Sequence, residues 1–333
     1  MSCLLYSGLA VFLLLILPLS SLVYAAEGTF NQWLTGFRED AVKAGISSSA
    51  IEAVIPHIEL QSKALELDRR QPETTLSLND YLQQMVSKRR IAAGVEAWRQ
   101  NHRLIAQATR EYGVEGEYLV ALWGIETGYG KGTGNMPVAS CLATLAYDGR
   151  RGAYFKSELL DFLRLVAEGK GVQPDALGSW AGAMGQFQFM PSSYLKFAVD
   201  FNHDGKRDLW GSTPDALGSA ANYLHSSGWI RGAGWGKAVK LPAKFSSKKY
   251  PSSLVQSATA WRRLGFKLPG VPDDVKLHLI QPEGKKGPAF LVTANFEAIL
   301  TWNRSASFAL AVGQLADRIR AEFKPSHAGK AKQ

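Results

Sequence analysis

The stretch Val120–Gly130 constrains this chain most, because it joins an apolar run to one acid and two glycines. Its apolar positions favour a buried helix over a strand, since the preceding segment Asn101–Tyr112 also has helical spacing. Glu126 then lies at the end of that helix, where Gly128 and Gly130 open a cleft. Burial disfavours a charged carboxyl, so we expect Glu126 to hold its proton to higher pH than free glutamate, as a general acid must. The alternative is a structural carboxylate capped by local amides.

Composition and charge narrow the class of partner. The 333 residues have 46% hydrophobic content, which is enough for one large core or two linked ones. The formal net charge of +9 indicates an anionic polymer, an anionic membrane face or nucleic acid as partner. The basic residues are scattered and form no nucleic-acid footprint, which favours a polysaccharide carrying carboxylates and predicts no nucleic-acid binding.

The N-terminus predicts export. Residues 4–23 form an apolar run with a small-x-small exit at Ala25, so we interpret 1–25 as a cleaved signal peptide and expect a periplasmic protein. An uncleaved N-terminal anchor is the alternative, because the run is about long enough to span a bilayer. Cys3 has no lipobox before it, and removal of the signal leaves Cys141 alone, so a disulfide framework is excluded.

Helical spacing over most of the chain predicts a mainly α (α+β) protein with several parts. We expect a helical core at 27–237, a small β-containing insertion at 238–294, a helix returning to the core at 295–323 and a disordered basic tail at 324–333. The insertion is assigned from its prolines and from short alternating runs at Lys276–Ile280 and Ala289–Val292. The hexapeptide Pro174–Ser179 recurs as Pro214–Ser219, and we interpret both copies as helix entries.

The segment Ser179–Pro191 has the composition of a sugar-binding loop. Its small residues allow the backbone to approach a ligand closely, while Gln186 and Gln188 supply amides. Aromatic residues in and beside the segment supply flat apolar faces, and sugars bind through such a mixture of stacking and directed polar contacts. A packed core loop is the alternative.

A second motif, beginning at Asp200, predicts a cation site. The run matches an EF-hand calcium loop at positions 1, 3, 5, 6 and 9, with Gly205 at the sharp turn. Position 12 is Gly211 in place of the bidentate glutamate, so the site is incomplete, weaker or closed from elsewhere. Asp215 is the nearest later carboxylate able to close it. We expect a structural cation, and the alternative is a metal-free Asx-turn loop.

Together these motifs resemble the membrane-bound lytic murein transglycosylase B family, of which this chain looks like a soluble member. The resemblance runs from about Phe30 to Ile319 and is carried by Glu126–Gly130, Ser179–Tyr194, the Asp200 loop, Ala221–Leu224 and Trp302–Ser305. It implies a lysozyme-like core and cleavage of the MurNAc–GlcNAc β-1,4 bond of peptidoglycan, leaving a 1,6-anhydro-MurNAc end. It also implies glycan strands as the partner of a monomer, with other cell-wall enzymes as further candidate partners.

The resemblance assigns roles to individual residues. Glu126 matches the catalytic acid/base. The implied substrate-binding residues are Ser179, Gln188, Tyr223, Trp302, Phe308 and Tyr129. Trp302 and Phe308 stand where the family often places tyrosines, which puts hydroxyl contacts there in doubt. The implied ligands of a structural Ca²⁺ or Na⁺ are Asp200, Asn202, Asp204, the Lys206 carbonyl and Asp215, and catalysis needs no cofactor. The interval from Asp208 to Asp215 looks one residue longer than usual.

The chemistry of the residues agrees with a single-acid reaction. Glycosidases normally place two carboxylates around the scissile bond, yet no acid lies between Glu126 and Asp148 or within Ser179–Tyr194. Glu126 would then protonate the leaving oxygen and afterwards accept the proton of the MurNAc 6-hydroxyl as that group attacks. Two alternatives stay open: an inverting peptidoglycan hydrolase (muramidase) in which a distant acid such as Asp148 activates water, and a non-catalytic wall-binding protein.

Overall fold

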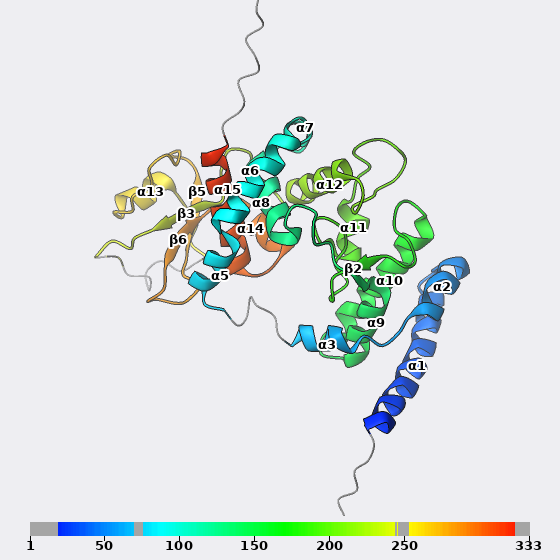
Figure 1. The fold of residues 1–333 in the computed structure, drawn as a ribbon. Coiled ribbons are helices and arrows are strands. Elements are labelled where there is room, and N and C mark those ends of the chain that lie inside the picture. The colour runs from blue at the N-terminus through cyan, green and yellow to red at the C-terminus, as the bar shows by residue number, and fades with distance from the viewer. Residues whose placement is uncertain (1–18, 70–75, 244, 246–252, 324–333) are drawn as a thin grey trace, which may run out of the picture.

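The computed structural model of the chain describes residues 19–69, 76–243, 245 and 253–323. Most of these residues are helical, as predicted (Figure 1). Residues 1–18 of the predicted signal peptide and the whole of the predicted tail at 324–333 lie outside the described residues. Within the described part, no helix combines the length and the apolar character needed to cross a membrane.

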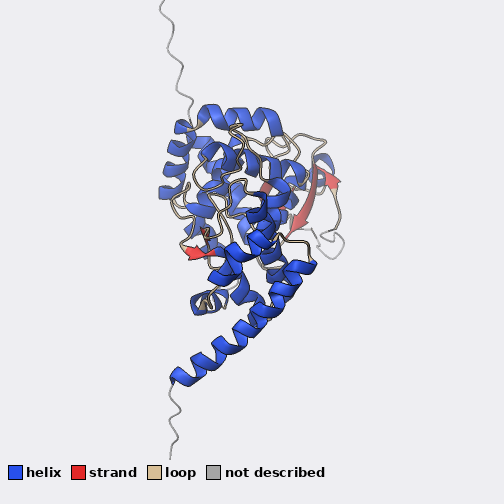
Figure 2. Cartoon of the chain, turned by 90° about the vertical axis from the view of Figure 1, so that its right-hand side faces the viewer, coloured by secondary structure: helices blue, strands red, loops and turns tan. Residues whose placement is uncertain are grey.

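The N-terminal helices comprise one long helix that projects from the body and short elements that pack on it. α1 (Leu19–Lys43) is a long helix that extends away from the body, as both views show (Figures 1 and 2). Its buried side chains Phe30, Leu34 and Phe37 recur at helical spacing. α2 (Ser48–Val54), the 3₁₀ turn η1 (Ile55–His57) and α3 (Ser62–Asp68) follow. Two of these elements pack on the next part of the chain, α2 on α10 and α3 on α9.

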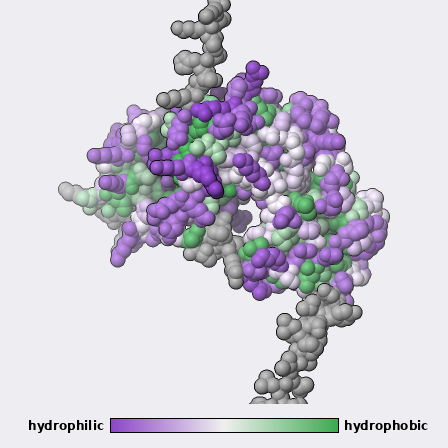
Figure 3. Space-filling view, in the orientation of Figure 1, coloured by the Kyte–Doolittle hydropathy of each residue, from purple (hydrophilic) through white to green (hydrophobic). Residues whose placement is uncertain are grey.

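The remaining helices form the main body. They are α5 (Leu78–Met85), α6 (Lys88–Gln100), α7 (His102–Tyr112), α8 (Gly116–Thr127), α9 (Val138–Asp148), α10 (Gly152–Glu168), α11 (Pro191–Phe197), α12 (Thr213–Ser226), α14 (Ala294–Trp302) and α15 (Ala306–Glu322), whereas α13 (Ala258–Arg263) belongs to a smaller, separate hydrophobic core. The surface in Figure 3 is mostly hydrophilic and is hollowed between the part that carries α5 and α6 and the part that carries α3 and α9.

α8 is the helix around which the body packs. Every residue from Gly116 to Gly124 is buried, and the helix contacts α6, α7, α12 and α15. A helix whose residues are mostly apolar around its whole circumference has to lie inside a protein, so the prediction of a buried helix over this stretch is confirmed. The helix ends at Thr127, where Gly128 takes the left-handed conformation with φ +60° that stops a helix without strain.

Strands form one small sheet and one short pair. The sheet is antiparallel in the order β3-β6-β5-β4, with β3 (Gly236–Val239), β4 (Gln256–Ser257), β5 (Lys276–Ile280) and β6 (Ala289–Val292). β5 and β6 coincide with the two alternating runs, and the sheet lies at one side of the helical body (Figure 2). It has a second hydrophobic core around the fully buried Trp261. The short pair joins β1 (Met136–Pro137) to β2 (Leu177–Gly178), and β1 contacts α9.

The expected single helix over 295–323 is wrong, because the structure has two. α14 ends at Trp302, where Asn303 is extended with φ −140° and ψ 121°. Ser305 then begins α15, since its hydroxyl accepts the backbone N–H of Phe308 as an N-cap. The break places Trp302 at the end of a helix, from which its indole N–H reaches Glu126 on α8.

The two hexapeptide copies also differ, so the interpretation of both as helix entries is wrong for the first. Pro214–Ser219 lies in α12, where Ser212 provides the N-cap by accepting the N–H of Asp215. The copy at Pro174–Ser179 instead makes a turn and contributes Leu177 and Gly178 to β2. Val172 stands two positions before the first proline, where the second copy has the N-cap Ser212, so the first copy has no such cap. Pairing with β1 then holds Leu177 and Gly178 in an extended conformation.

Candidate active site

Thr127 fixes the backbone that follows the acid. Its buried hydroxyl donates to the carbonyl of Gln186 at 2.6 Å and accepts the N–H of Gly130 at 3.0 Å. These bonds tie the end of α8 to the glycine turn and to the loop that begins at Ser179. Glu126, the preceding residue, is partly exposed, so its carboxyl is accessible while its backbone is held.

An aromatic wall stands beside Glu126. The indole Nε1–H of Trp302 donates to Oε1 of Glu126 at 2.9 Å, although the two residues are 176 positions apart. The Trp302 ring lies 4.5 Å from that of Tyr223, 5.0 Å from that of Phe189 and 6.4 Å from that of Phe187, measured between ring centroids. The C-terminal return of the chain therefore supplies the catalytic candidate with a hydrogen-bond donor.

The loop at 179–189 has a defined shape. The Ser179 hydroxyl accepts the backbone N–H groups of Ala181 and Ala183 at 3.3 and 3.1 Å. Gln188 is left-handed with φ +52°, and its amide donates to the carbonyls of Thr133 and Gly185 at 3.1 and 3.0 Å. Both predicted substrate-binding side chains are partly exposed. A non-glycine residue held in this conformation is a feature that often accompanies function.

The other three predicted substrate-binding aromatics have different surroundings. Tyr223 is 9% exposed, and its hydroxyl donates to the Thr301 carbonyl at 2.8 Å. Tyr129 donates its hydroxyl proton to the Arg90 carbonyl at 2.6 Å, which joins the turn after α8 to α6. Phe308 is a core residue with 3% exposure. Their contribution to substrate binding stays a prediction, which substitution can test.

Glu158 is an acid near the site that the sequence did not single out. It lies on α10 with 3% exposure, and its two oxygens accept the backbone N–H and the hydroxyl of Ser192 at 2.9 and 2.7 Å. Glu158 therefore caps α11, and its charge also acts on the buried Tyr223. Asp148, the acid proposed for the hydrolase alternative, is paired with Arg69 at 3.2 Å. Helix capping by a residue from another helix leaves no signal in the sequence.

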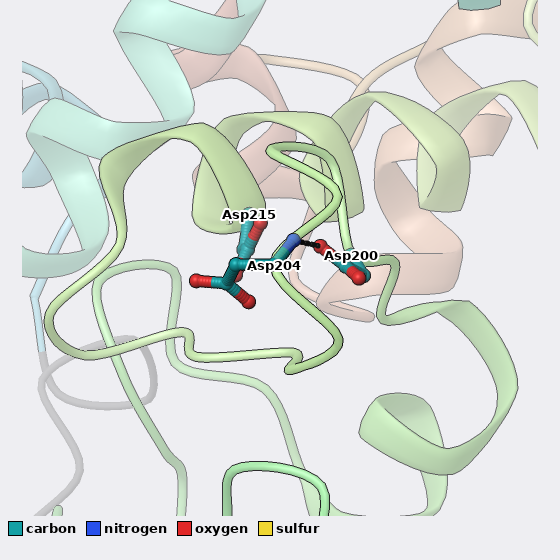
Figure 4. Close-up of side chains that lie close together, drawn as sticks. All are labelled: Asp200, Asp204 and Asp215. Carbon is teal, nitrogen blue, oxygen red and sulfur yellow. Dashed lines mark hydrogen bonds between the residues drawn. The ribbon is translucent and has the colours of Figure 1, made fainter.

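The loop from Asp200 to Asp215 brings carboxylates together (Figure 4). Single carboxylate oxygens of Asp200, Asp204 and Asp215 all lie within 4.8 Å of one another. Asp200 accepts the N–H groups of Asp204 and Gly205 at 3.0 and 2.7 Å. The pKa of Asp204 is lowered from its ordinary value, first by the amide of Asn202, so its carboxylate stays ionised at neutral pH. Three carboxylate oxygens at this spacing fit a hard cation.

Asp215 supplies the carboxylate that Gly211, at position 12 of the motif, cannot supply. It is fully buried at the start of α12 and accepts the backbone N–H groups of Phe201, Asn202 and Asp208. Asp208, at position 9 of the motif, instead accepts N–H groups of Trp210 and Gly211, each at 2.9 Å. Gly211, at position 12, has no side-chain ligand. The arrangement thus places Asp215, rather than Asp208, beside Asp200 and Asp204.

Comparison with known proteins decides the family. The sequence profile of the transglycosylase SLT domain family matches residues 29–317. The chain belongs to this family. Among proteins similar to this SLT-domain chain is membrane-bound lytic murein transglycosylase B of Escherichia coli (strain K12), 34% identical over 247 residues, a match covering 72% of this chain and 66% of that protein. The family prediction made from the motifs is therefore confirmed.

Solved structures of other lytic transglycosylases resemble this SLT-domain chain. SltB3 from Pseudomonas aeruginosa, in complex with NAG-NAM-pentapeptide, has a TM-score of 0.82 and 38% identity over 91% of this chain and 83% of that chain. Escherichia coli Slt35, in complex with calcium, has a TM-score of 0.73 and 29% identity over 87% of this chain and 93% of that chain. These matches confirm the predicted mainly α, lysozyme-like fold class.

Proposed function

We propose that this protein is a peptidoglycan lytic transglycosylase that cleaves the MurNAc–GlcNAc β-1,4 bond without water and leaves a 1,6-anhydro-MurNAc end. The observation that carries the proposal is the partly exposed Glu126 at the end of the buried α8, beside an aromatic wall. Family membership supports it, as do the SltB3 complexes with NAG-NAM-pentapeptide and NAG-anhNAM-pentapeptide. The enzyme would accordingly be a lyase acting on a polysaccharide.

Glu126 carries both proton transfers in this mechanism. Its carboxyl gives a proton to the glycosidic oxygen as the bond from C1 of MurNAc to that oxygen breaks, and the bonding electron pair stays on the oxygen. The 6-hydroxyl of the same MurNAc then attacks C1, and its proton passes to the Glu126 carboxylate, which restores the acid. Glu158 is a poor candidate for a second catalytic carboxylate, because it is buried and bonded to Ser192 through both oxygens.

The glycan would lie along the aromatic wall and the loop at 179–189. Trp302 supplies a flat face, while the Ser179 hydroxyl and the Gln188 amide lie on the partly exposed loop. Sugar rings bind to such combinations of apolar faces and fixed polar groups. Tyr223, Tyr129 and Phe308 complete the proposed set, in which Tyr223 supports the wall through its contact with Trp302.

A structural Ca²⁺ belongs to the proposal, with Na⁺ as the alternative ion. Its ligands would be Asp200, Asn202, Asp204, the Lys206 carbonyl and Asp215, and the calcium complex of Slt35 supports the choice. The cation would neutralise the clustered carboxylates and hold the loop on α12. It would take no part in bond cleavage.

Export completes the proposal: a periplasmic monomer, released by signal cleavage after Ala25, that acts on glycan strands alongside other cell-wall enzymes. The apolar run at 4–23 and the net positive charge support export and an anionic wall partner, respectively.

Product analysis tests the function directly. Purified sacculi are digested with the protein, and the soluble fragments are separated and weighed by mass spectrometry. A lytic transglycosylase yields fragments with anhydro ends, each lighter by one water than the reducing-end fragment that a muramidase yields. Reducing MurNAc ends would refute the lyase assignment, and binding to sacculi with no soluble product would support the wall-binding alternative.

A further inference from the structure

We propose that Trp302 is a positioning residue for the acid/base, because its indole N–H fixes one oxygen of Glu126 as an acceptor and so assigns proton transfer to the other. The inference rests on the proposed role of Glu126. Trp302 donates to Oε1 of Glu126 at 2.9 Å. An indole N–H can donate but cannot accept a hydrogen bond, so Oε1 accepts the hydrogen bond from the indole and the transferable proton is placed on Oε2.

The donor is itself held in place. Tyr223 lies 4.5 Å from the Trp302 ring at 35°, and Phe189 lies 5.0 Å away nearly perpendicular to it at 84°. The Tyr223 hydroxyl donates to the carbonyl of Thr301, the residue before Trp302, at 2.8 Å. Restricting the rotation of the indole in this way lets it restrict the carboxyl in turn, as a preorganised site requires.

The contact with Trp302 lets Glu126 perform both proton transfers without turning its carboxyl. Oε2 would give its proton to the glycosidic oxygen and later accept the proton of the 6-hydroxyl. A tyrosine hydroxyl can donate or accept and would not assign the proton to one oxygen. The indole N–H of Trp302 can only donate, which permits one arrangement of this contact.

Glu126 is the carboxyl that the Trp302 indole contacts directly. Titratable groups on the surrounding elements include Tyr223 on α12, Tyr129 after α8, Tyr154 and Glu158 on α10, and Arg90 on α6. They also include the exposed His225 on α12, whose Nδ1 lies 2.8 Å from the Tyr112 carbonyl, and two ion-paired acids, Glu117 on α8 with Arg320 and Glu297 on α14 with His278. Burial raises the pKa of all three tyrosines above the ordinary value of 10.0, so they stay neutral. Burial lowers the pKa of Arg90 from 12.5, and this guanidinium stays bonded to the carbonyls of Gln84 and Met85.

Replacing one atom of the ring tests the role. Site-specific incorporation of 3-benzothienylalanine at position 302 substitutes sulfur for the N–H and keeps the ring, while 7-azatryptophan keeps the N–H and is the matched control. We expect kcat on purified peptidoglycan to fall about tenfold with KM nearly unchanged, because orientation is lost while the flat face remains. Since a donor stabilises the ionised carboxyl, its loss raises the pKa of Glu126 and moves the alkaline limb of the kcat/KM profile up by about one pH unit. The azatryptophan protein, which keeps the donor, should retain a clearly higher kcat than the benzothienyl protein and a smaller shift of the alkaline limb.

A spectroscopic readout separates this inference from the proposed function. In ¹⁵N-indole NMR spectra, the Nε1–H resonance of Trp302 should shift with the ionisation of Glu126 and stay constant in Glu126→Gln. The indole of Trp261 donates to the Leu277 carbonyl at 2.9 Å and should not titrate, so it is the internal reference. A Trp302 resonance independent of pH, or a benzothienyl protein with wild-type kcat and pH profile, would overturn the positioning role. An active Glu126→Gln protein would instead overturn the proposed function.

Discussion

Glu126 and Asp215 are the same kind of group in opposite surroundings. Asp215 is fully buried and accepts backbone N–H groups of Phe201, Asn202 and Asp208. Glu126 is partly exposed and meets an indole N–H on an aromatic wall. Amides fixed by the backbone suit a permanent charge that holds a cation, whereas a carboxyl at an accessible apolar wall suits the release and recovery of a proton.

The two sites also differ in how the chain builds them. The carboxylates at Asp200, Asp204 and Asp215 come from one short stretch, and backbone groups of the same stretch support them. The acid site combines α8, the loop at 179–189, α12 and the end of α14. Damage to the first should therefore appear mainly as lost stability, and damage to the second mainly as lost turnover.

The largest expected effect is on turnover in Glu126→Gln. Loss of the transferable proton should lower product formation by about 10²- to 10⁴-fold, while the melting temperature and binding to sacculi are retained. The matched control is Glu158→Gln, which weakens the cap of α11 and should cost about 1–3 kcal/mol of stability but leave turnover measurable. Equal loss of turnover in the two folded proteins would indicate a pair of catalytic carboxylates.

The next effect is on stability in Asp215→Ala. The substitution leaves three backbone N–H groups in or beside the core without their acceptor, so we expect the free energy of unfolding to fall by about 3 kcal/mol in a urea titration. Turnover per folded molecule at low temperature should change little. Asp208→Ala is the control, because its bonds to Trp210 and Gly211 lie in a more exposed turn and its loss should cost less.

The sequence predicted the local parts of both sites and missed the distant ones. The buried helix that carries Glu126 and the clustered loop carboxylates each follow from a pattern within about sixteen consecutive residues. Interactions between residues that are close in sequence are enough to form such local structure. The Trp302 contact and the Glu158 cap join residues from separate helices, so no local pattern encodes them. The hexapeptide at 174–179 and 214–219 makes the same point, since six identical residues form a turn leading into a two-residue strand in one context and part of a helix in the other.

Removal of the proposed cation should have an effect that depends on its concentration. At free Ca²⁺ about a hundredfold above its dissociation constant, binding to the folded state adds about 2.7 kcal/mol of stability. We therefore expect a chelator to lower the melting temperature and added Ca²⁺ to restore it. Asp204→Ala should abolish this response without changing the product type, and Na⁺ added in place of Ca²⁺ identifies the ion. A melting temperature indifferent to both ions would favour the metal-free loop.

The smallest expected effect is on stability in Tyr129→Phe. It shows whether Tyr129 joins α6 to α8 or binds substrate. Its hydroxyl donates to the Arg90 carbonyl at 2.6 Å. A Cβ placed on Gly94 would lie 2.6 Å from the Tyr129 hydroxyl oxygen, and a Cβ placed on Gly124 would lie 2.5 Å from it. The hydroxyl thus occupies the close approach of α6 and α8. Losing it should cost about 1 kcal/mol in a urea titration, because the carbonyl loses its donor. A residue that binds glycan through this hydroxyl would instead raise KM without a loss of stability, so measuring both quantities on one variant separates a brace of α8 from a contact with substrate.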